Sequence, residues 1–438
     1  MKTIRNMKLV VNPTQETITE VLKRPKMEAV QLDETIRNVF REVEQNGDQA
    51  LLKFTEQFDG VQLDQLKVSE AEIELTNELL PDSLKKAILT AAANIERFHT
   101  SQQQEVEVIE TTAGVTCWRK SVPVQSVGLY IPGGTAPLFS TVLMLGIPAK
   151  IVACPVRILC TPPAKDGSIH PAILFAASVA GITEIYKVGG SQAIAAMSIG
   201  TESIPKVDKL FGPGNQYVTA AKQYAQQLGI AIDLPAGPSE VLVAADDSVP
   251  AAFIAADLLA QAEHGADSQV VLVTDSEAFV GSIQQALTEQ LERLPRASVA
   301  LQALENSVAI VVDSSEWAGI INQYAPEHLI LIGKYEQEVL GQVVNAGSVF
   351  LGQFTAESFG DYASGTNHTL PTAGFARAYS GVSLDSFVKK ITYQRVSETG
   401  LNNLGNTVIE LAKAEQLEAH AYAIEVRLMA QTNQQQQS

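Results

Sequence analysis

Hydrophobic residues recur at helical spacing in the first part of the chain. One set follows at steps of three and four residues: Leu84, Ile88, Ala92, Ile95 and Phe98. This spacing places the set on one face of an amphipathic helix. The Pro81-Asp82-Ser83 segment directly before it is a typical helix start. We therefore predict that roughly the first 110 residues are mainly helical.

From residue 127 the pattern changes to short apolar runs that alternate with helical segments. Several runs are too continuous for half-exposed strands, so they predict buried strands of a parallel sheet. The expected strands are Val127–Ile131, Val156–Cys160, Ile185–Val188, Ala231–Leu234, Val241–Ala245, Val270–Thr274, Val308–Val312, His328–Leu331 and Ser348–Leu351. Alternating strands and helices predict an α/β architecture. So many strands favour two α/β domains over one.

The C-terminal part returns to a helical pattern after about residue 382. Glu, Lys, Ala and Leu follow one another in helical order from Leu404 to Met429. The last residues, 432–438, are polar, and we expect them to be frayed. The pattern thus predicts a helical C-terminal tail.

Composition narrows the class of protein. A chain of 438 residues with 46% hydrophobic and 18% charged residues is typical of a globular protein with a large core. The net charge of −18 argues against nucleic acid or an anionic membrane as a partner. No apolar run has membrane-spanning length, and residues 1–10 lack a secretion signal pattern.

Cysteine usage predicts a cytoplasmic protein with reduced thiols. Cys117, Cys154 and Cys160 form no CxxC pair and no even set of disulfides. Nothing beside Cys117 or Cys154 in the sequence indicates a lowered pKa. We therefore expect buried apolar thiols rather than nucleophiles.

Three glycine-rich turns follow predicted strands. They are residues 130–137, 188–193 and 211–215. Glycine allows a close approach of backbone to ligand, and free N–H groups at the next helix start favour phosphate. The three turns therefore suggest a shared nucleotide site, although neither GxGxxG nor GxxxxGK[ST] is present. Glycines that only make tight turns are an equally good explanation of any single one.

Gln261 and His264 stand three residues apart after a long Ala/Leu helical pattern, so both side chains lie on one helix face. They could form half of a metal site whose other ligands come from Asp361, His368 or His420. A set of nitrogen and oxygen donors without cysteine suits a site that also takes substrate atoms. The alternative is a helix-face histidine that is only hydrogen-bonded.

Glu327 and His328 are adjacent titratable residues at the start of a predicted strand. Neighbours on an extended chain point to opposite faces, so both could reach one atom only if the backbone turns. Two groups with different pKa values could serve two proton transfers. The alternative is an exposed glutamate beside a half-buried histidine.

Taken together, these motifs resemble one family, histidinol dehydrogenase. The resemblance covers nearly the whole chain, in order. Its segments are residues 130–137, 188–193, 211–215, 234–240, 261–265, 325–329, 360–365, 367–371 and 415–420.

The resemblance implies a role for each matching residue. The implied zinc ligands are Gln261, His264, Asp361 and His420. The implied catalytic pair is Glu327 and His328. The implied NAD contacts are Tyr130, Gln192 and Asn215. Substrate contacts are implied for Ser239, His368 and Glu415, together with Gln261, His264, His328, Asp361 and His420.

The resemblance also implies two Rossmann-like α/β domains and a homodimer. We expect a helical arm at residues 1–28 and a first α/β domain, with the zinc and catalytic residues, at 29–129 and 238–382. An NAD domain is expected at 130–237 and a helical dimerisation tail at 383–438. Glu415 and His420 would then enter the active site of the other subunit.

The implied reaction is the oxidation of L-histidinol to L-histidine by two NAD and water. His328 would take the alcohol proton, and Glu327 would activate the water that hydrates the aldehyde. Zinc would hold the aldehyde between the two hydride transfers. The alternatives are a related dehydrogenase of another small alcohol, such as sulfopropanediol, and an inactive α/β scaffold. The intact Ser239, His368 and Glu415 favour histidinol.

Overall fold

The computed structural model describes residues 2–4, 7–24, 30–133, 136–235 and 237–435. It consists of two compact units. The larger unit contains residues 1–102 and 124–387, and the smaller unit contains residues 103–123 and 388–438. No described helix combines the length and the apolar character that crossing a bilayer requires.

Seven strands form the first sheet of the larger unit, in the order β1-β2-β12-β11-β10-β13-β14. All neighbours are parallel except β1 and β2, which are antiparallel. The strands are β1 (Lys2–Ile4), β2 (Met7–Val11), β10 (Glu240–Ala245), β11 (Gln269–Thr274), β12 (Val308–Val311), β13 (His328–Ile332) and β14 (Ser348–Leu351).

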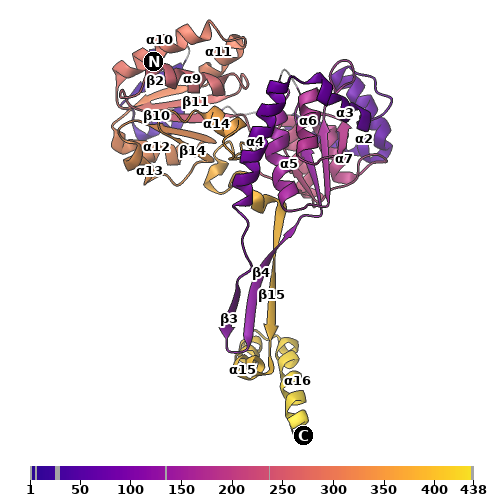
Figure 1. The fold of residues 1–438 in the computed structure, drawn as a ribbon. Helices are drawn as coiled ribbons and strands as arrows, with labels where there is room; N and C mark the ends of the chain where they lie inside the picture. The colour runs from indigo at the N-terminus through magenta and orange to yellow at the C-terminus, as the bar shows by residue number, and fades with distance from the viewer. Residues whose placement is uncertain (1, 5–6, 25–29, 134–135, 236, 436–438) are drawn as a thin grey trace. The chain divides into compact units, whose positions relative to one another are not determined.

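Helices cover both faces of this first sheet (Figure 1). Successive residues of a strand point to opposite faces. Val241 and Val243 therefore pack among α9, α10 and α11, whereas Leu242 packs among α1, α12 and α13. The helices are α1 (Gln15–Val21), α9 (Ala251–Ala262), α10 (Glu277–Leu291), α11 (Ala297–Glu305), η2 (Ser314–Glu316), α12 (Trp317–Tyr324), α13 (Glu336–Leu340) and α14 (Glu357–Tyr362).

The second sheet of the larger unit has five parallel strands in the order β7-β6-β5-β8-β9. They are β5 (Ser126–Tyr130), β6 (Val156–Thr161), β7 (Glu184–Lys187), β8 (Lys209–Phe211) and β9 (Ala231–Ile232). Leu159 faces α4, α5 and α6, and Ile158 faces α2, α7 and α8. The helices are α2 (Val30–Phe54), η1 (Thr55–Asp59), α3 (Glu70–Leu79), α4 (Asp82–Thr100), α5 (Phe139–Ile151), α6 (Pro171–Val179), α7 (Gly190–Ile199) and α8 (Gln216–Gln227). The short helices η3 (Phe375–Arg377) and η4 (Leu384–Phe387) complete the unit.

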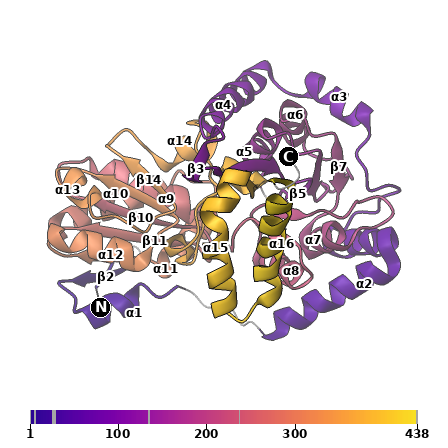
Figure 2. The ribbon, with the colours of Figure 1, turned by 90° about the horizontal axis from the view of Figure 1, so that it is seen from below.

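The smaller unit is an antiparallel sheet followed by two helices. β4 (Val115–Pro123) pairs on one side with β3 (Val108–Thr112) and on the other with β15 (Val388–Val396). α15 (Glu398–Ala414) and α16 (Glu418–Gln435) lie side by side (Figure 2). Ile409, Ala412 and Ala421 form the small core between them.

The predicted α/β class with two parallel-sheet domains is confirmed, and all nine predicted strands are present. Residues 2–4 of the predicted helical arm form β1, and two further segments predicted as helical also contain strands. Residues 7–11 form β2, because Met7 and Val10 are buried when the segment pairs with β12. Residues 388–396 form β15, which pairs with β4 along its whole length. β2 and β15 each pair with a strand distant in sequence. The helical periodicity of neighbouring segments therefore led to a wrong prediction for them.

Residues 432–435 were expected to be frayed, but they belong to α16, which continues to Gln435. Some predicted features lie outside the described residues. These are residues 25–28 of the predicted N-terminal arm, Gly134 and Thr135 of the first glycine-rich turn, Ala236, and residues 436–438. The predicted domain boundaries stay predictions.

Candidate functional site

A cavity of about 500 Å³ in the larger unit is lined by residues of both parallel sheets. From the second sheet come residues at the carboxyl ends of β5 and β8. From the first sheet come residues at the amino ends of β10 and β13. The predicted site residues that line it are Tyr130, Asn215, Ser239, His264, Glu327 and His368. The cavity thus brings together residues that were predicted for three different roles.

Tyr130 and Gln192 lie at the carboxyl edge of the second sheet. Tyr130 is the last residue of β5, and its hydroxyl oxygen accepts a hydrogen bond of 3.0 Å from the N–H of Gly190. Burial raises the pKa of Tyr130 far above its ordinary value, so the phenol stays neutral. Gln192 is buried in the first turn of α7. Two glycine-rich turns are therefore tied together at this edge.

Asn215 caps the helix that follows the third glycine-rich turn. Its side-chain oxygen accepts hydrogen bonds from the N–H groups of Tyr217 at 3.0 Å and Val218 at 3.2 Å. This contact satisfies two of the free N–H groups at the start of α8. Asn215 therefore has a structural role besides the one predicted for it.

Gly212 is held by a buried ion pair. Lys222 and Asp233 form this pair, and Lys222 Nζ donates to the Gly212 oxygen at 2.9 Å. The Gly212 N–H donates to Asp233 Oδ2 at 2.8 Å. Gly212 has φ +128°, and a Cβ there would lie 2.1 Å from the Tyr130 carbonyl oxygen. The turn therefore requires glycine for its own geometry.

Glu327 and His328 are both buried, at 6% and 4% exposure, so the alternative of an exposed glutamate does not apply. Ala325, with φ 52°, ends α12 and turns the chain just before β13. The turn brings Glu327 Oε2 within 3.7 Å of His328 Nδ1, although the residues are adjacent. Glu327 Oε2 also accepts from the N–H of Glu240 at 2.9 Å. The glutamate is therefore fixed by the first residue of β10.

The His328 ring lies among carboxylates. Its Nδ1 is 3.9 Å from Glu357 Oε1, and its Nε2 is 3.5 Å from Asp361 Oδ1. Burial by itself would lower the pKa of His328, but the charges of Glu357, Glu327 and Asp361 raise the pKa well above its ordinary value. Neither ring nitrogen has a hydrogen-bond partner among the described residues. The ring is therefore available to a ligand.

His264 and Asp361 converge at one place, as the motifs predicted. A nitrogen of His264 and carboxylate oxygens of Glu357 and Asp361 all lie within 4.8 Å of one another. Gln261 is buried, and its Oε1 finds no hydrogen-bond partner within the described part of the chain. Buried polar atoms normally have a partner. Nitrogen and oxygen donors of this kind fit a divalent cation such as zinc.

Glu357 is not among the residues predicted from the sequence. It stands four residues before Asp361, which places the two carboxylates on one face of α14. The spacing of four residues could have indicated Glu357 as a second carboxylate beside Asp361. Burial raises the pKa of Glu357 to about 8.

His368 and Ser239 lie at the cavity, and the sequence analysis named His368 also as a possible metal ligand. His368 Nε2 is 3.0 Å from Thr141 Oγ1, and its Nδ1 is 2.8 Å from the Asp361 carbonyl oxygen. Burial lowers the pKa of His368. Both of its ring nitrogens are therefore engaged within the chain. Ser239 precedes β10 directly.

Glu415 and His420 belong to the smaller unit. Glu415 follows α15 directly, and His420 lies in the first turn of α16. Gln416 between them has φ 60°, which makes the turn between the two helices tight. Both Glu415 and His420 are exposed.

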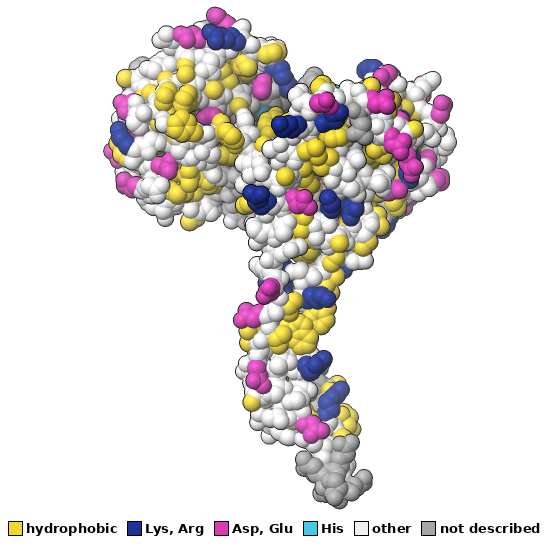
Figure 3. Space-filling view, in the orientation of Figure 1, with side chains coloured by type: hydrophobic (Ala, Val, Ile, Leu, Met, Phe, Trp, Pro, Cys, Tyr) yellow, Lys and Arg dark blue, Asp and Glu magenta, His cyan; other side chains and the backbone are white. Residues whose placement is uncertain are grey.

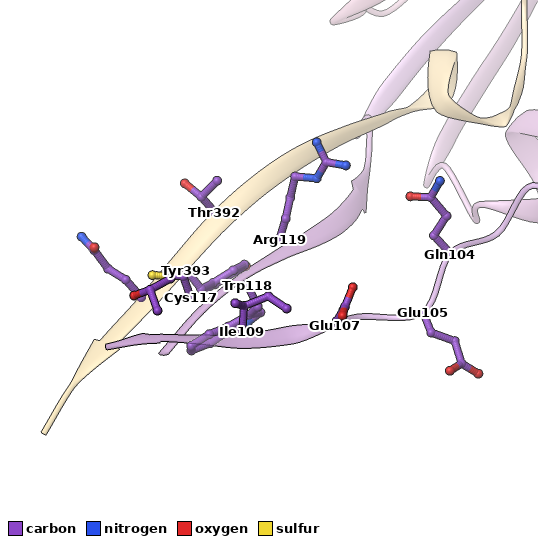
Figure 4. A pocket seen from close by; sticks show the side chains of 11 residues that line it. Gln104, Glu105, Glu107, Ile109, Cys117, Trp118, Arg119, Thr392 and Tyr393 are labelled. Atoms are coloured by element: carbon purple, nitrogen blue, oxygen red, sulfur yellow. The ribbon is translucent and has the colours of Figure 1, made fainter. Parts of the chain in front are cut away.

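A wider groove of about 710 Å³ lies within the smaller unit and contains no predicted site residue. Trp118 and Tyr393 stack across β4 and β15 with ring centroids 5.5 Å apart (Figure 4). Hydrophobic side chains gather on this face of the sheet (Figure 3). The groove combines these two stacked rings with polar and charged residues, among them Glu105, Glu107 and Arg119.

The cysteines are free. Cys154 and Cys160 are buried, whereas Cys117 is only half-buried, so the expectation of a buried thiol was wrong for Cys117. Burial raises the pKa of Cys154 to about 11, and it raises the pKa of Cys160 as well. Thiols that stay protonated are poor nucleophiles, which agrees with the prediction for Cys154.

Comparisons with known proteins agree over nearly the whole length. The sequence model of the family described as "Histidinol dehydrogenase" matches residues 22–428. Histidinol dehydrogenase of Bacteroides thetaiotaomicron is 55% identical over 423 residues, which cover 96% of this chain and 99% of the relative. The Bacteroides fragilis enzyme shows the same identity and coverage. The crystal structure of histidinol dehydrogenase from Elizabethkingia anophelis is 52% identical, with a TM-score of 0.95 over 98% of this chain and 99% of the other.

Proposed function

The chain belongs to the histidinol dehydrogenase family of oxidoreductases, and on that premise we propose that it oxidises L-histidinol to L-histidine with two NAD and one Zn²⁺. One observation carries the proposal. Buried Glu327 lines the same cavity as the glycine-rich turns and His264, and the buried ring of His328 lies next to Glu327 and Asp361.

The proposed reaction balances over two oxidations. The alcohol loses a hydride and a proton and becomes the aldehyde. Water adds to the aldehyde, and the hydrate loses a second hydride and a proton to become the acid. NAD, when bound, accepts the hydride in each oxidation. The protein must therefore remove a proton at two different oxygens.

His328 is proposed as the base for the alcohol proton. Its two ring nitrogens are buried and have no hydrogen-bond partner among the residues described. A neutral imidazole without internal partners can accept a proton from a substrate hydroxyl. His328 would be neutral once a divalent cation offsets the carboxylate charges that otherwise raise its pKa. The nearby carboxylates of Glu357 and Asp361 stabilise the imidazolium that results.

Glu327 is proposed as the base for the water that hydrates the aldehyde. It lines the cavity, and the hydrogen bond from the Glu240 N–H fixes one of its carboxylate oxygens. A fixed carboxylate can hold a water in position for attack. Glu327 and His328 would thus act on different oxygens although they are adjacent in sequence.

Gln261, His264 and Asp361 are proposed to hold Zn²⁺, with His420 of a second subunit as the fourth ligand. Zn²⁺, when bound, supplies a cation that holds the nitrogens of the substrate and keeps the aldehyde from leaving. Ser239, His368 and Glu415 are proposed as further substrate contacts. Tyr130, Gln192 and Asn215 are proposed to contact NAD at the carboxyl edge of the second sheet.

The proposed homodimer is supported by the apolar surface of the smaller unit. Val108, Ile109 and Val396 are 57%, 47% and 51% exposed on its three-stranded sheet. Exposed apolar side chains gathered on one sheet are typical of an interaction surface. A cytoplasmic location is part of the same proposal, since all three cysteines are unpaired.

Initial rates of NADH formation test the proposed function. We expect L-histidinol to be oxidised and 2,3-dihydroxypropane-1-sulfonate (sulfopropanediol) not to be. Prolonged chelation should abolish the rate, and added Zn²⁺ should restore it. Preferred oxidation of the sulfonate would contradict the proposed substrate, and full activity after chelation would contradict the proposed metal.

A further inference from the structure

Glu357 is a buried carboxylate to which the proposed reaction gives only an electrostatic role. Its side chain is 1% exposed at the start of α14. No described residue forms a hydrogen bond with its Oε2 atom. Its Oε1 atom is 3.9 Å from His328 Nδ1, which is too long for a hydrogen bond. A buried carboxylate without a partner is costly, so this group calls for a ligand.

The position of Glu357 indicates what that ligand is. Oxygens of Glu357 and Asp361 and a nitrogen of His264 all lie within 4.8 Å of one another. Donor atoms around one zinc ion, with bonds of about 2.1 Å, lie up to roughly 4 Å apart. A small rotation of the side chains is therefore enough for all three atoms to share one ion.

The charges around Glu357 favour a cation. Glu327, Glu357 and Asp361 surround the His328 ring. Within the described ranges, neither lysine nor arginine forms an ion pair with any of the three carboxylates. Two buried or half-buried cations of the same unit have other partners, since Arg24 pairs with Glu240 and Lys222 pairs with Asp233. A bound divalent ion would compensate these carboxylates.

We propose that Glu357 is a metal ligand, so that a single subunit offers four donors: Gln261, His264, Glu357 and Asp361. This inference rests on the proposed function for the presence of the metal. It adds that one subunit holds the ion without His420 of a second subunit. Glu357 would complete the set of donors while that histidine or the substrate is absent.

Cobalt binding to the metal-free protein tests the proposal without any assay of activity. Co²⁺ reports its ligands through its visible absorption bands, and titration gives its affinity. We expect Glu357→Gln to weaken Co²⁺ binding by roughly a hundredfold and to change the bands, because one oxygen donor is lost. Glu292→Gln, which removes an exposed carboxylate from the same unit, should leave both unchanged. His420→Ala should keep the affinity within about tenfold of the wild-type value.

Thermal unfolding adds a check on folding. Without metal, Glu357→Gln should melt at or slightly above the wild-type Tm, because it replaces a buried carboxyl group whose Oε2 has no partner among the described residues. With Co²⁺ it should gain less in Tm than the wild type does. If the substitution merely damaged the core, the Tm of the variant would lie below the wild-type value both with and without Co²⁺.

Three outcomes would overturn the proposal. The first is wild-type affinity with wild-type bands in Glu357→Gln. The second is weaker binding with unchanged bands, which would make Glu357 only an electrostatic neighbour. In both cases the proposed function would stand. The third is a wild-type protein that binds no Co²⁺, which would also remove the metal from the proposed function.

Discussion

The two parallel sheets of the larger unit present opposite edges to the cavity. The second sheet uses its carboxyl edge, where Tyr130 and Gly212 follow β5 and β8. The first sheet uses its amino edge, where Ser239 precedes β10 and Glu327 precedes β13. The carboxyl edge is the usual ligand site of an open α/β sheet. The first sheet departs from this rule.

At the carboxyl edge of the first sheet, hydrogen bonds to one side chain hold two loops together. Asp246, just after β10, accepts from the N–H groups of Ser248 and Lys334. A Cβ at Gly333 would lie 2.2 Å from the Asp246 carboxylate. The Asp246 carboxylate is therefore occupied within the chain.

The two edges offer different groups to a ligand. At the carboxyl edge of the second sheet, glycine turns and helix starts offer backbone N–H groups, which suit a phosphate-bearing cofactor. At the amino edge of the first sheet, side chains from the ends of α9 and α12 converge, because these helices run back along the strands. We infer that binding of NAD depends on the first arrangement and proton transfer on the second.

The largest effect is expected from His328→Asn, which keeps a polar side chain but removes the base. The kcat for oxidation of histidinol should fall by about 10²- to 10⁴-fold. The Kd of NAD, measured by titration calorimetry, should stay unchanged, since His328 belongs to the other edge. A variant with normal kcat would remove His328 from its proposed role, and a large change in Kd would break the separation of the edges.

Glu327→Gln should affect the second oxidation more than the first. Loss of the base that activates water should slow oxidation of histidinaldehyde by about 10²-fold or more, with a smaller effect on the alcohol. The two oxidations can be measured separately from each substrate by stopped-flow absorbance of NADH. A variant slowed only on the alcohol would reverse the roles assigned to Glu327 and His328.

Gly212→Ala should act on the carboxyl edge alone. The added Cβ meets the Tyr130 carbonyl oxygen at 2.1 Å, and φ of +128° disfavours alanine. Strain of about 1–3 kcal/mol corresponds to roughly tenfold to hundredfold weaker binding of NAD. Gly229→Ala is a matched control, since Gly229 has φ +86° but nothing within 4 Å. If both variants weakened NAD binding equally, backbone strain would explain the effect, and the turn at Gly212 would have no specific role.

The smallest effect concerns Asp257, one turn before Gln261 on α9. Burial raises the pKa of Asp257 to about 7 from its ordinary value of 3.8. Between these values the folded protein holds a proton that the unfolded chain has released, so stability falls as pH rises. From pH 4 to pH 7, the free energy of unfolding of Asp257→Asn should fall by about 1–2 kcal/mol less than that of the wild type. Urea unfolding across this range measures it, with exposed Asp247→Asn as control. An unchanged slope would show that Asp257 ionises normally.

The sequence predicted the parts that depend on local pattern. Continuous apolar runs identify strands such as β10 and β13 because both of their faces are buried. Glycine turns after strands marked the carboxyl edge, since strand direction alone determines which ends meet there. β2 and β15 could not be predicted this way, because each depends on pairing with a distant strand.

The candidate site was predicted in part for a similar reason. Gln261, His264 and Asp361 were named from their motifs, and the structure brings His264 and Asp361 together. Glu357 was missed, because its closeness to His264 arises from the packing of α14 near α9. The clamp of Lys222 and Asp233 on Gly212 was missed too, since nothing local in the sequence marks a buried ion pair.

We propose that one cavity, with NAD at one edge and proton transfer at the other, carries out both oxidations. The amount of NADH formed from a limiting, known amount of L-histidinol tests it most directly. We predict two NADH for each histidinol consumed, with L-histidine as the product. One NADH with release of histidinaldehyde, or no NADH at all from the metal-loaded protein, would contradict the account.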